Sequence, residues 1–230
     1  NNMRQDFTPY FISAHHCSHN ENPQGFRFYF NYYRDGCNEG EVILGEYAYS
    51  SVIISDCDCH SNWWGPDYVL LEITDDIPID WDVYYAGFNA TDPIQMPVSV
   101  GVHHPGGAPK RINYDSGFAS WYEWDSSGPH DTHWWFTWDD GGTEGGSSGS
   151  AVYDDAGRIA GVLSGGNGDC ELGTGYDLYG KIATSWEWGI SPETRLKDWL
   201  DPENTGELLL GGTYNIPPVI GDVNSDQILN

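Results

Sequence analysis

Short runs of aromatic and β-branched residues, separated by turn residues, most restrict how this chain can fold. Twenty-nine Gly and 13 Pro punctuate the sequence. Runs of this kind predict strands, and their spacing favours an all-β sandwich or barrel over alternating βα units. The runs that we expect to form strands are Phe26 to Tyr32, Tyr68 to Ile73, Val83 to Phe88, Val98 to His103 and Arg158 to Leu163.

One segment near the C-terminal end predicts a helix instead. Ser191 is a suitable N-cap, Pro192 suits the first helical turn, and Asp201-Pro202 ends the segment. Three apolar residues between these signals fall on one helical face: Leu196, Trp199 and Leu200.

The size and charge of the chain exclude several classes of protein. Its 230 residues allow one sizeable domain or two small ones that share a core. No apolar run approaches the roughly 18 residues of a membrane-spanning helix. Nine Lys and Arg stand against 35 Asp and Glu, a net charge of −26. This charge argues against a nucleic-acid partner and favours a soluble monomer, secreted into a salty exterior.

Three segments carry residues that could perform nucleophilic catalysis. In chain order they are FISAHHC at Phe11 to Cys17, GPDYVLLE at Gly65 to Glu72, and GGSSGS at Gly145 to Ser150. Acyl transfer needs a hydroxyl, an imidazole base and a carboxylate that fixes the imidazole tautomer. It also needs backbone N–H groups aimed at the developing oxyanion, and a serine between glycines supplies them on a sharp turn.

These segments resemble those of trypsin-like serine proteases with the chymotrypsin fold, and more closely the bacterial lysyl endopeptidases. Further matching segments are VGVHHPGGAPKRI, GGTEGGSSGSAVYD, GVLSGG, YDLYGKIATSW and TRLKDWLDPENTG. The similarity runs from about Thr8 to Gly211. It implies an all-β fold of two antiparallel six-stranded β-barrels, followed by a C-terminal helix.

The resemblance also implies a division of the chain. We expect residues 1–78 to form the first barrel, which is N-terminally incomplete, and residues 79–210 to form the second barrel and the helix. Residues 211–220 would be a linker, and residues 221–230 the start of another module.

Carried over by position, the resemblance assigns the catalytic roles. His16 is the general base, Asp67 the orienting carboxylate and Ser148 the nucleophile. Asp56 and Asp58 compete with Asp67, but no apolar strand follows them. The backbone N–H groups of Gly146 and Ser148 would form the oxyanion hole.

Ser147 occupies the position where mammalian trypsins carry an aspartate that pairs with a newly freed N-terminal amine. Activation through such an ion pair is therefore not expected.

The resemblance places the substrate-binding residues as well. Asp177 matches the pocket carboxylate of lysyl endopeptidases, so we expect cleavage of protein or peptide substrates after Lys, with Arg as the second candidate. Ser164, Gly165 and Gly166 would pair with an extended substrate, and Trp121 matches an aromatic residue beside the active site. Ser164 replaces a histidine of the family, which puts strict lysine preference in doubt and makes a hydrogen bond to Asp67 available. The alternative is that Asp177 is one of many surface acids.

The five cysteines leave alternatives open. In the resembling proteins, cysteines at the positions of Cys17, Cys37 and Cys170 pair with partners upstream. Cys57 and Cys59 have no assignable partners, and a metal role together with His60 is an alternative.

The tail resembles the opening of a dockerin-like calcium repeat. Asp222, Asn224 and Asp226 have the alternate spacing of the first oxygen ligands of a calcium loop. Gln227 stands where such loops carry glycine. Calcium and a cohesin-like or surface anchor are therefore expectations for this module, whereas the proposed catalysis needs no cofactor. The alternative is an acidic linker.

Three other functions compete with a protease. A zinc hydrolase would use His130 and His133, or His103 and His104. A carbohydrate-binding module would use tryptophans such as Trp63-Trp64 and Trp134-Trp135, which are more often core residues. An inactive protease homologue is the third alternative.

Overall fold

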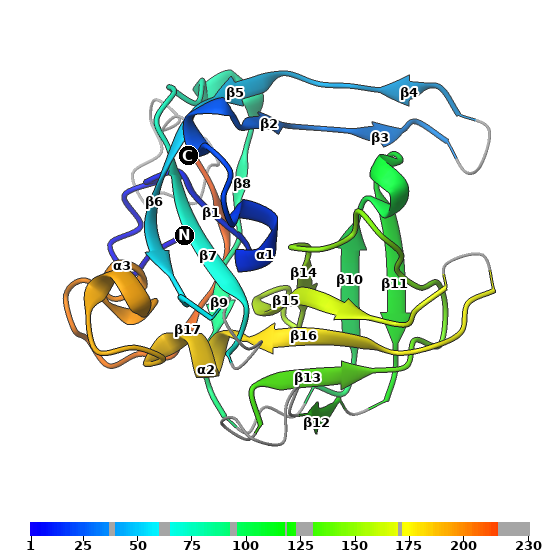
Figure 1. Ribbon diagram of the computed structural model, residues 1–230. Coiled ribbons are helices and arrows are strands. Elements are labelled where there is room, and N and C mark those ends of the chain that lie inside the picture. Colours follow the sequence, from blue (N-terminus) through cyan, green and yellow to red (C-terminus); the bar gives the residue numbers. More distant parts are fainter. Residues whose placement is uncertain are drawn as a thin grey trace, which may run out of the picture.

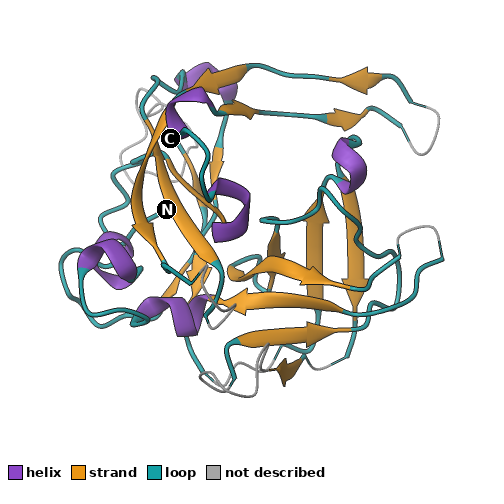
Figure 2. Ribbon diagram, in the orientation of Figure 1, coloured by secondary structure: helices purple, strands orange, loops and turns teal. Residues whose placement is uncertain are grey.

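The computed structural model is mostly β-sheet with a few short helices (Figures 1 and 2). It describes residues 1–36, 40–59, 65–92, 96–117, 119–122, 131–169 and 172–215. Several predictions fall outside these residues: those on Cys37, His60, Trp63-Trp64, His130 and Cys170, and the calcium ligands Asp222, Asn224 and Asp226. Within the described part, no helix is long and apolar enough to cross a membrane.

A three-stranded antiparallel sheet forms the centre of the N-terminal part. Its order is β1 (Tyr10–Ala14), β7 (Tyr68–Ile73) and β6 (Ser51–Asp56). The middle strand β7 is buried on both faces except at Glu72, as its apolar sequence predicts. Its register with β1 places Ala14 opposite Tyr68, so the residues just after β1 lie beside the residue just before β7.

Two short ribbons extend from this sheet across the molecule. One joins β2 (Arg27–Tyr29) to β5 (Tyr47–Tyr49), and the other joins β3 (Tyr33–Arg34) to β4 (Val42–Ile43). In Figure 1 they form a long arm that reaches towards the strands of the C-terminal part. Tyr32, between β2 and β3, donates a hydrogen bond from its hydroxyl to the Gly107 carbonyl at 3.1 Å. The arm therefore connects the two parts of the chain.

A curled nine-stranded sheet makes up most of the C-terminal part. Its main path is β11 (Arg111–Asp115), β10 (Ser99–His103), β14 (Ala151–Tyr153), β15 (Ile159–Gly166), β16 (Asp177–Lys181), β13 (His133–Phe136) and β12 (Ser120–Tyr122). The remaining strands are β9 (Phe88–Asn89), which pairs parallel with β15, and β17 (Leu209–Leu210). Large buried side chains of this part pack together in one apolar cluster: Met96, Trp134, Phe136, Leu163 and Tyr179.

The described strands do not divide into two antiparallel six-stranded barrels. Their hydrogen bonds form sheets of nine and three strands and three two-stranded ribbons, the third joining β18 (Thr213–Tyr214) to β8 (Tyr84–Tyr85). The β9–β15 pair is also parallel rather than antiparallel. The expected number of strands per barrel is thus not confirmed, whereas the all-β class is.

The helices are all short. They are α1 (His15–Ser18), α2 (Ile182–Trp186) and α3 (Lys197–Leu200), with 3₁₀ turns η1 (Pro23–Gly25), η2 (Ile79–Trp81), η3 (Pro105–Gly107) and η4 (Pro192–Thr194). The single helix expected from Ser191 is broken into η4 and α3, because Arg195 between them is extended. The Leu196 N–H donates instead to the Ser185 carbonyl at 3.0 Å, a contact with α2.

One apolar cluster contains residues from both of the expected barrels, whose boundary was placed between residues 78 and 79. It contains Ala14, Tyr68 and Leu70 from the N-terminal part. From the C-terminal part it contains Phe88, Val162, Ile182, Leu196 and Leu200. The division into two domains stays a prediction, but the two parts share a core.

Candidate active site

His16 and Asp67 meet because two strands end side by side. β1 leads directly into the single turn α1, which carries His16, and Asp67 directly precedes β7. The His16 Nδ1 lies 2.7 Å from Asp67 Oδ2, and the His16 backbone N–H donates to Asp67 Oδ1 at 3.1 Å. The His15 backbone N–H donates to the Asp67 carbonyl at 3.1 Å. Three contacts therefore hold the imidazole against the carboxylate.

The electrostatics of this pair favour a protonated imidazole. The hydrogen bond with Asp67, followed by one with Cys17, raises the pKa of His16 to about 10. The Asp67 side chain is 8% exposed and the His16 side chain 28%. The imidazole is therefore the partner that reaches the surface, whereas the carboxylate is nearly buried. A neutral His16 that donates from Nδ1 to Asp67 has Nε2 as its acceptor nitrogen.

The turn that carries Ser148 lies against the end of β1. A Cβ on Gly149 would lie 2.2 Å from the Ser13 Oγ and 3.1 Å from the Ala14 backbone nitrogen. The backbone of Gly149 adopts φ 80°, and its N–H donates to the Leu163 carbonyl at 2.9 Å. Because Ala14 is followed by His15 and His16, the structure brings the Ser148 turn and the His16–Asp67 pair to the same place.

The backbone amides of this turn fall into two groups. The N–H groups of Ser147, Gly149 and Ser150 donate to the carbonyls of Glu144, Leu163 and Ser147. Within the described part of the chain, no hydrogen bond is formed by the N–H groups of Gly146 and Ser148, while Gly146 has φ 95°. Two unpaired amides beside a serine are the arrangement that an oxyanion would need.

Asp177 is buried rather than one of the surface acids. The residue is 1% exposed. Its two oxygens accept hydrogen bonds from the Thr143 hydroxyl and the Trp138 indole N–H, both at 2.6 Å. Burial raises the pKa of Asp177, and these two hydrogen bonds oppose the shift.

The space beside Asp177 is bounded by glycines. A Cβ on Gly166 would lie 2.9 Å, and one on Gly168 2.8 Å, from the Asp177 Oδ1. Any side chain at these positions would thus fill the space beside the carboxylate.

The other predicted substrate-binding residues lie along β15 and β12. Gly165 and Gly166 end β15, opposite Leu178 and Asp177 of β16. The Ser164 hydroxyl is paired with the His133 Nε2 at 3.1 Å, rather than with Asp67. Trp121 lies in β12 opposite Trp134, and its side chain is outside the described part.

Four residues near the site had no role in the protease predicted from the sequence. Trp138 and Thr143 hold Asp177. His133 is buried between Ser164 and Thr132, and burial lowers its pKa to about 4. His103 lies 2.8 Å from the Ser147 hydroxyl through Nδ1. Of these four residues, the sequence had drawn attention only to His103 and His133, as candidate zinc ligands.

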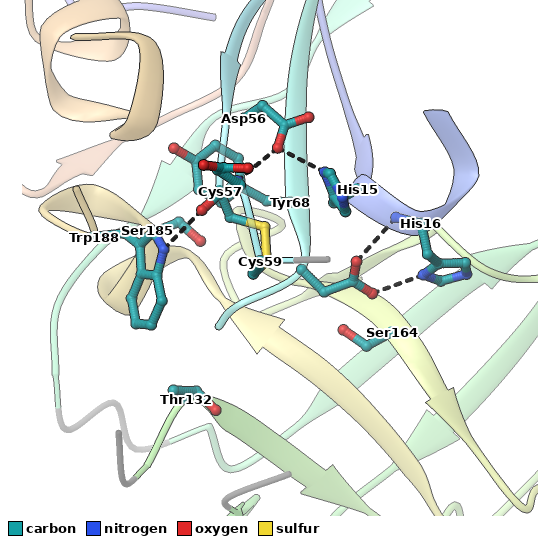
Figure 3. The surroundings of a disulfide bond; sticks show 12 residues. His15, His16, Asp56, Cys57, Cys59, Tyr68, Thr132, Ser164, Ser185 and Trp188 are labelled. Atoms are coloured by element: carbon teal, nitrogen blue, oxygen red, sulfur yellow. Dashed lines mark hydrogen bonds and ion pairs between the residues drawn. A yellow bond between two sulfur atoms is a disulfide. The ribbon is translucent and has the colours of Figure 1, made fainter. Parts of the chain in front are cut away.

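Next to the His16–Asp67 pair, a second histidine contacts a second carboxylate (Figure 3). The His15 Nδ1 lies 2.6 Å from the Asp56 Oδ1. Burial disfavours the charged form of His15, but the hydrogen bond and charge of Asp56 outweigh it and raise the pKa. Asp56, which competed with Asp67 on sequence, thus pairs with His15.

Cys57 and Cys59 form a disulfide with each other, so neither sulfur is a free thiolate. His15, Asp56 and Cys57 form the only described group of at least three side chains close enough to share a metal ion. With Cys57 oxidised, this group lacks a thiolate ligand. His103 and His104, considered for zinc, contact Ser147 and the Ala108 carbonyl instead. Among the described cysteines, only Cys17 is outside a disulfide, and it is exposed.

Known proteins with solved structures share this fold. A Glu endopeptidase in complex with MPD superposes with a TM-score of 0.51 at 15% identity, over 76% of this chain and 77% of that chain. A scabies mite inactivated protease paralogue superposes with a TM-score of 0.57 at 10% identity, over 78% and 81% of the two chains. These similarities show the fold, that of the chymotrypsin-like proteases.

The sequence also matches a family model, described as the lysyl endopeptidase C-terminal domain, over residues 1–180. That match spans well over half of the 230 residues. Together with the fold, it supports a serine peptidase. The chain belongs to the lysyl endopeptidase C-terminal domain family.

Proposed function

We propose that the protein is a secreted serine endopeptidase that hydrolyses peptide bonds after Lys, with Arg as the second candidate, through an acyl-enzyme. The observation that carries the proposal is the His16–Asp67 hydrogen bond at 2.7 Å, next to the glycine turn of Ser148. In this proposal His16 is the general base, Asp67 orients it and Ser148 is the nucleophile.

The reaction would proceed in two halves. His16 Nε2 accepts the Ser148 hydroxyl proton while Oγ attacks the carbonyl carbon, and the amides of Gly146 and Ser148 stabilise the oxyanion. His16 then gives the proton to the leaving amine, which departs from the acyl-enzyme. Water, activated by the same imidazole, hydrolyses the ester. These steps need no cofactor.

Lysine specificity is supported by the buried Asp177 and the glycines beside it. A carboxylate that is 1% exposed has an uncompensated charge until a cation reaches it. An apolar substrate side chain would bury that charge without a partner, whereas a lysine ammonium would neutralise it. Ser164 to Gly166 would hydrogen-bond the substrate backbone as an added strand. Trp121 would lie beside it.

Secretion is supported by the Cys57–Cys59 disulfide, because disulfides persist mainly in oxidising compartments. In the same proposal the enzyme is a monomer. Asp222, Asn224 and Asp226 would begin a calcium-binding, dockerin-like module that anchors it.

Labelling with a fluorophosphonate probe tests the catalytic assignment. The wild-type protein is expected to label, and Ser148→Ala is expected to abolish labelling. Ser150→Ala removes another hydroxyl from the same loop and serves as the matched control, which should still label. Undiminished labelling of Ser148→Ala would place the nucleophile elsewhere. A wild type that fails to label would favour an inactive homologue.

Cleavage of a peptide library tests the specificity. We expect products that end in Lys, and in Arg to a smaller extent. A preference for acidic or large apolar residues before the cleaved bond would contradict the role of Asp177. Glycan binding that persists in Ser148→Ala, without proteolysis by the wild type, would instead support the carbohydrate-binding alternative.

A further inference from the structure

The turn that carries Ser148 is held from one side by a histidine at the end of β10. The His103 Nδ1 lies 2.8 Å from the Ser147 hydroxyl, and both residues are 1% exposed. The Ser147 hydroxyl oxygen also accepts the Glu144 backbone N–H at 3.4 Å. One buried hydroxyl therefore connects the start of the turn, its centre and a neighbouring strand.

Strand β10 is well placed to fix this turn. It pairs with β11 on one edge and with β14 on the other, and Val102 lies opposite Ala151. β14 begins at Ala151, three residues after Ser148. The chain after β10 contacts the turn again, because the Gly106 N–H donates to the Gly145 carbonyl at 2.8 Å. A Cβ on Gly146 would lie only 3.1 Å from the Gly106 nitrogen.

The contact is a hydrogen bond between neutral groups. Burial, followed by the charge of His104, lowers the pKa of His103 to about 4, so the imidazole is uncharged near neutral pH. Its other nitrogen, Nε2, is buried without a hydrogen-bond partner in the described part of the chain. All of its polar bonding therefore goes through Nδ1 to Ser147.

We propose that His103 is a positioning residue, which holds the Gly145–Ser148 turn through the Ser147 hydroxyl and thereby presents the Gly146 and Ser148 amides to the oxyanion. Mammalian trypsins carry an aspartate at the position of Ser147, and this aspartate forms an ion pair. In this protein the residue at that position forms a hydrogen bond with a histidine instead. The inference rests on the proposed serine peptidase function. It adds a residue that touches neither substrate nor the reacting atoms.

Kinetics of variants of the full chain on a Lys-containing peptide amide test this proposal. Losing one oxyanion donor costs about 100- to 1,000-fold in kcat. Displaced donors should cost less, so we expect His103→Phe and Ser147→Ala each to lower kcat by about 10- to 100-fold, with KM nearly unchanged. His103→Asn should recover most of kcat, because its amide occupies the position of Nδ1.

A double-mutant cycle separates positioning from general destabilisation. If His103 acts through Ser147, the double variant should be no slower than the slower single variant, because both changes break the same bond. Ser185→Ala is the matched control: it removes a buried hydroxyl that donates to the Lys181 carbonyl at 2.8 Å, and kcat should not change. Unchanged kcat in His103→Phe, losses confined to KM, or multiplicative losses in the double variant would overturn the proposal.

Failure of this inference is distinguishable from failure of the proposed function. The function is wrong if fluorophosphonate labelling survives Ser148→Ala, whatever His103 does. Amide hydrogen exchange in residues 144–150 then still reports on the turn: it should increase in Ser147→Ala, and no increase would overturn the inference. If His103→Phe fails to fold, Ser147→Ala decides both readouts, because it removes a single oxygen atom.

Discussion

At the scale of single residues, the site depends on two carboxylates with different surroundings. Asp67 is beside a histidine and accepts hydrogen bonds from its ring and backbone. Asp177 is buried between Thr143 and Trp138, and no cationic side chain in the described part of the chain forms an ion pair with it. The charge of the first carboxylate is therefore compensated by a protonated His16, whereas in the proposed function the second binds a positively charged substrate side chain.

The first prediction concerns pH. Because the pKa of His16 is raised to about 10, Nε2 is protonated near neutral pH, and the rate should increase with pH until the imidazole loses this proton. Asp67→Asn should move this rise towards the ordinary histidine pKa of about 6.5 and lower the maximal kcat by about 10,000-fold. The pH profile of kcat/KM measures both effects.

Cys17→Ala is the comparison for this profile, because the hydrogen bond with Cys17 is the second cause of the raised pKa. It should move the rise to lower pH and leave the maximal rate nearly unchanged. The effect of pH on stability has the opposite sign. The His16–Asp67 interaction stabilises the fold fully at a pH below the pKa that His16 has in the unfolded chain. This stabilisation is lost as the pH rises through the pKa of His16 in the folded protein. A rate that is independent of pH from 6 to 10 would contradict the role of His16.

The second prediction concerns Asp177. In Asp177→Asn, the amide nitrogen would face either the Thr143 hydroxyl or the Trp138 N–H, and the charge would be lost. We expect kcat/KM for Lys substrates to fall by about 100-fold or more, since such buried charge contacts are worth about 2–5 kcal/mol. Asp155→Asn, an exposed carboxylate, is the control and should change kcat/KM little. Equal losses in both variants would rule out a pocket role.

At the scale of elements, the glycine turn before β14 determines how closely the two parts of the site approach. Gly149 combines φ 80° with contact against Ser13 and Ala14 of β1. Each property excludes a side chain at this position. The positive φ would strain the backbone of any other residue, and a Cβ would overlap atoms of Ser13 and Ala14. The turn therefore links the conformation of β14 to the position of α1.

The third prediction compares two glycines. Gly149→Ala should lower both kcat and the melting temperature, because a Cβ would overlap the Ser13 Oγ. Gly157→Ala shares the strain, with φ 72°, but nothing lies within 4 Å of its Cβ, so it should cost only about 1–2 kcal/mol. Its kcat should be normal. If the two variants behave alike in activity and thermal unfolding, the contact with β1 does not matter.

The sequence predicts the elements that depend on local pattern and misses those that depend on distant partners. Tyr68 to Ile73 forms β7 over the predicted residues, because its apolar side chains are buried on both faces. The expected strand Val83 to Phe88 is instead divided between β8 and β9, which pair with β18 and with β15 and β17. No local signal in the chain indicates these partners.

The same limit applies to the site. Asp67 directly precedes the predicted strand Tyr68 to Ile73, and its proximity to His16 follows from the single antiparallel pairing of that strand with β1. The sequence makes a hydrogen bond from Ser164 to Asp67 available, but Ser164 pairs with His133, whose position depends on the pairing of β13 with β16. Trp138 belongs to no motif, and Thr143 lies in the GGTEGGSSGSAVYD segment without a role of its own. Their contacts with Asp177 follow only from the three-dimensional fold, because the two residues lie 39 and 34 positions away from it in the sequence.

At the scale of the whole molecule, net charge is the dominant feature. A charge of −26 on 230 residues attracts cations at long range and repels other acidic molecules. This field should assist the approach of basic peptides, while Asp177 acts only after binding.

The fourth prediction is a salt dependence that follows the charge of the substrate. For a peptide with lysines on both sides of the cleaved bond, kcat/KM should fall several-fold between about 0.01 and 1 M NaCl, as the screening length shrinks from about 30 to 3 Å. For a matched peptide flanked by aspartates, it should rise. The same response from both peptides would mean that the surface charge does not steer substrates.

The apolar cluster that runs from Ala14 and Tyr68 to Ile182 and Leu196 has a mechanical consequence. Because side chains from the N-terminal and C-terminal parts of the chain pack together in it, the two parts cannot separate without unpacking the interior. In the proposed function, we therefore expect a substrate to bind with little rearrangement of the protein, so that little loss of conformational entropy opposes binding.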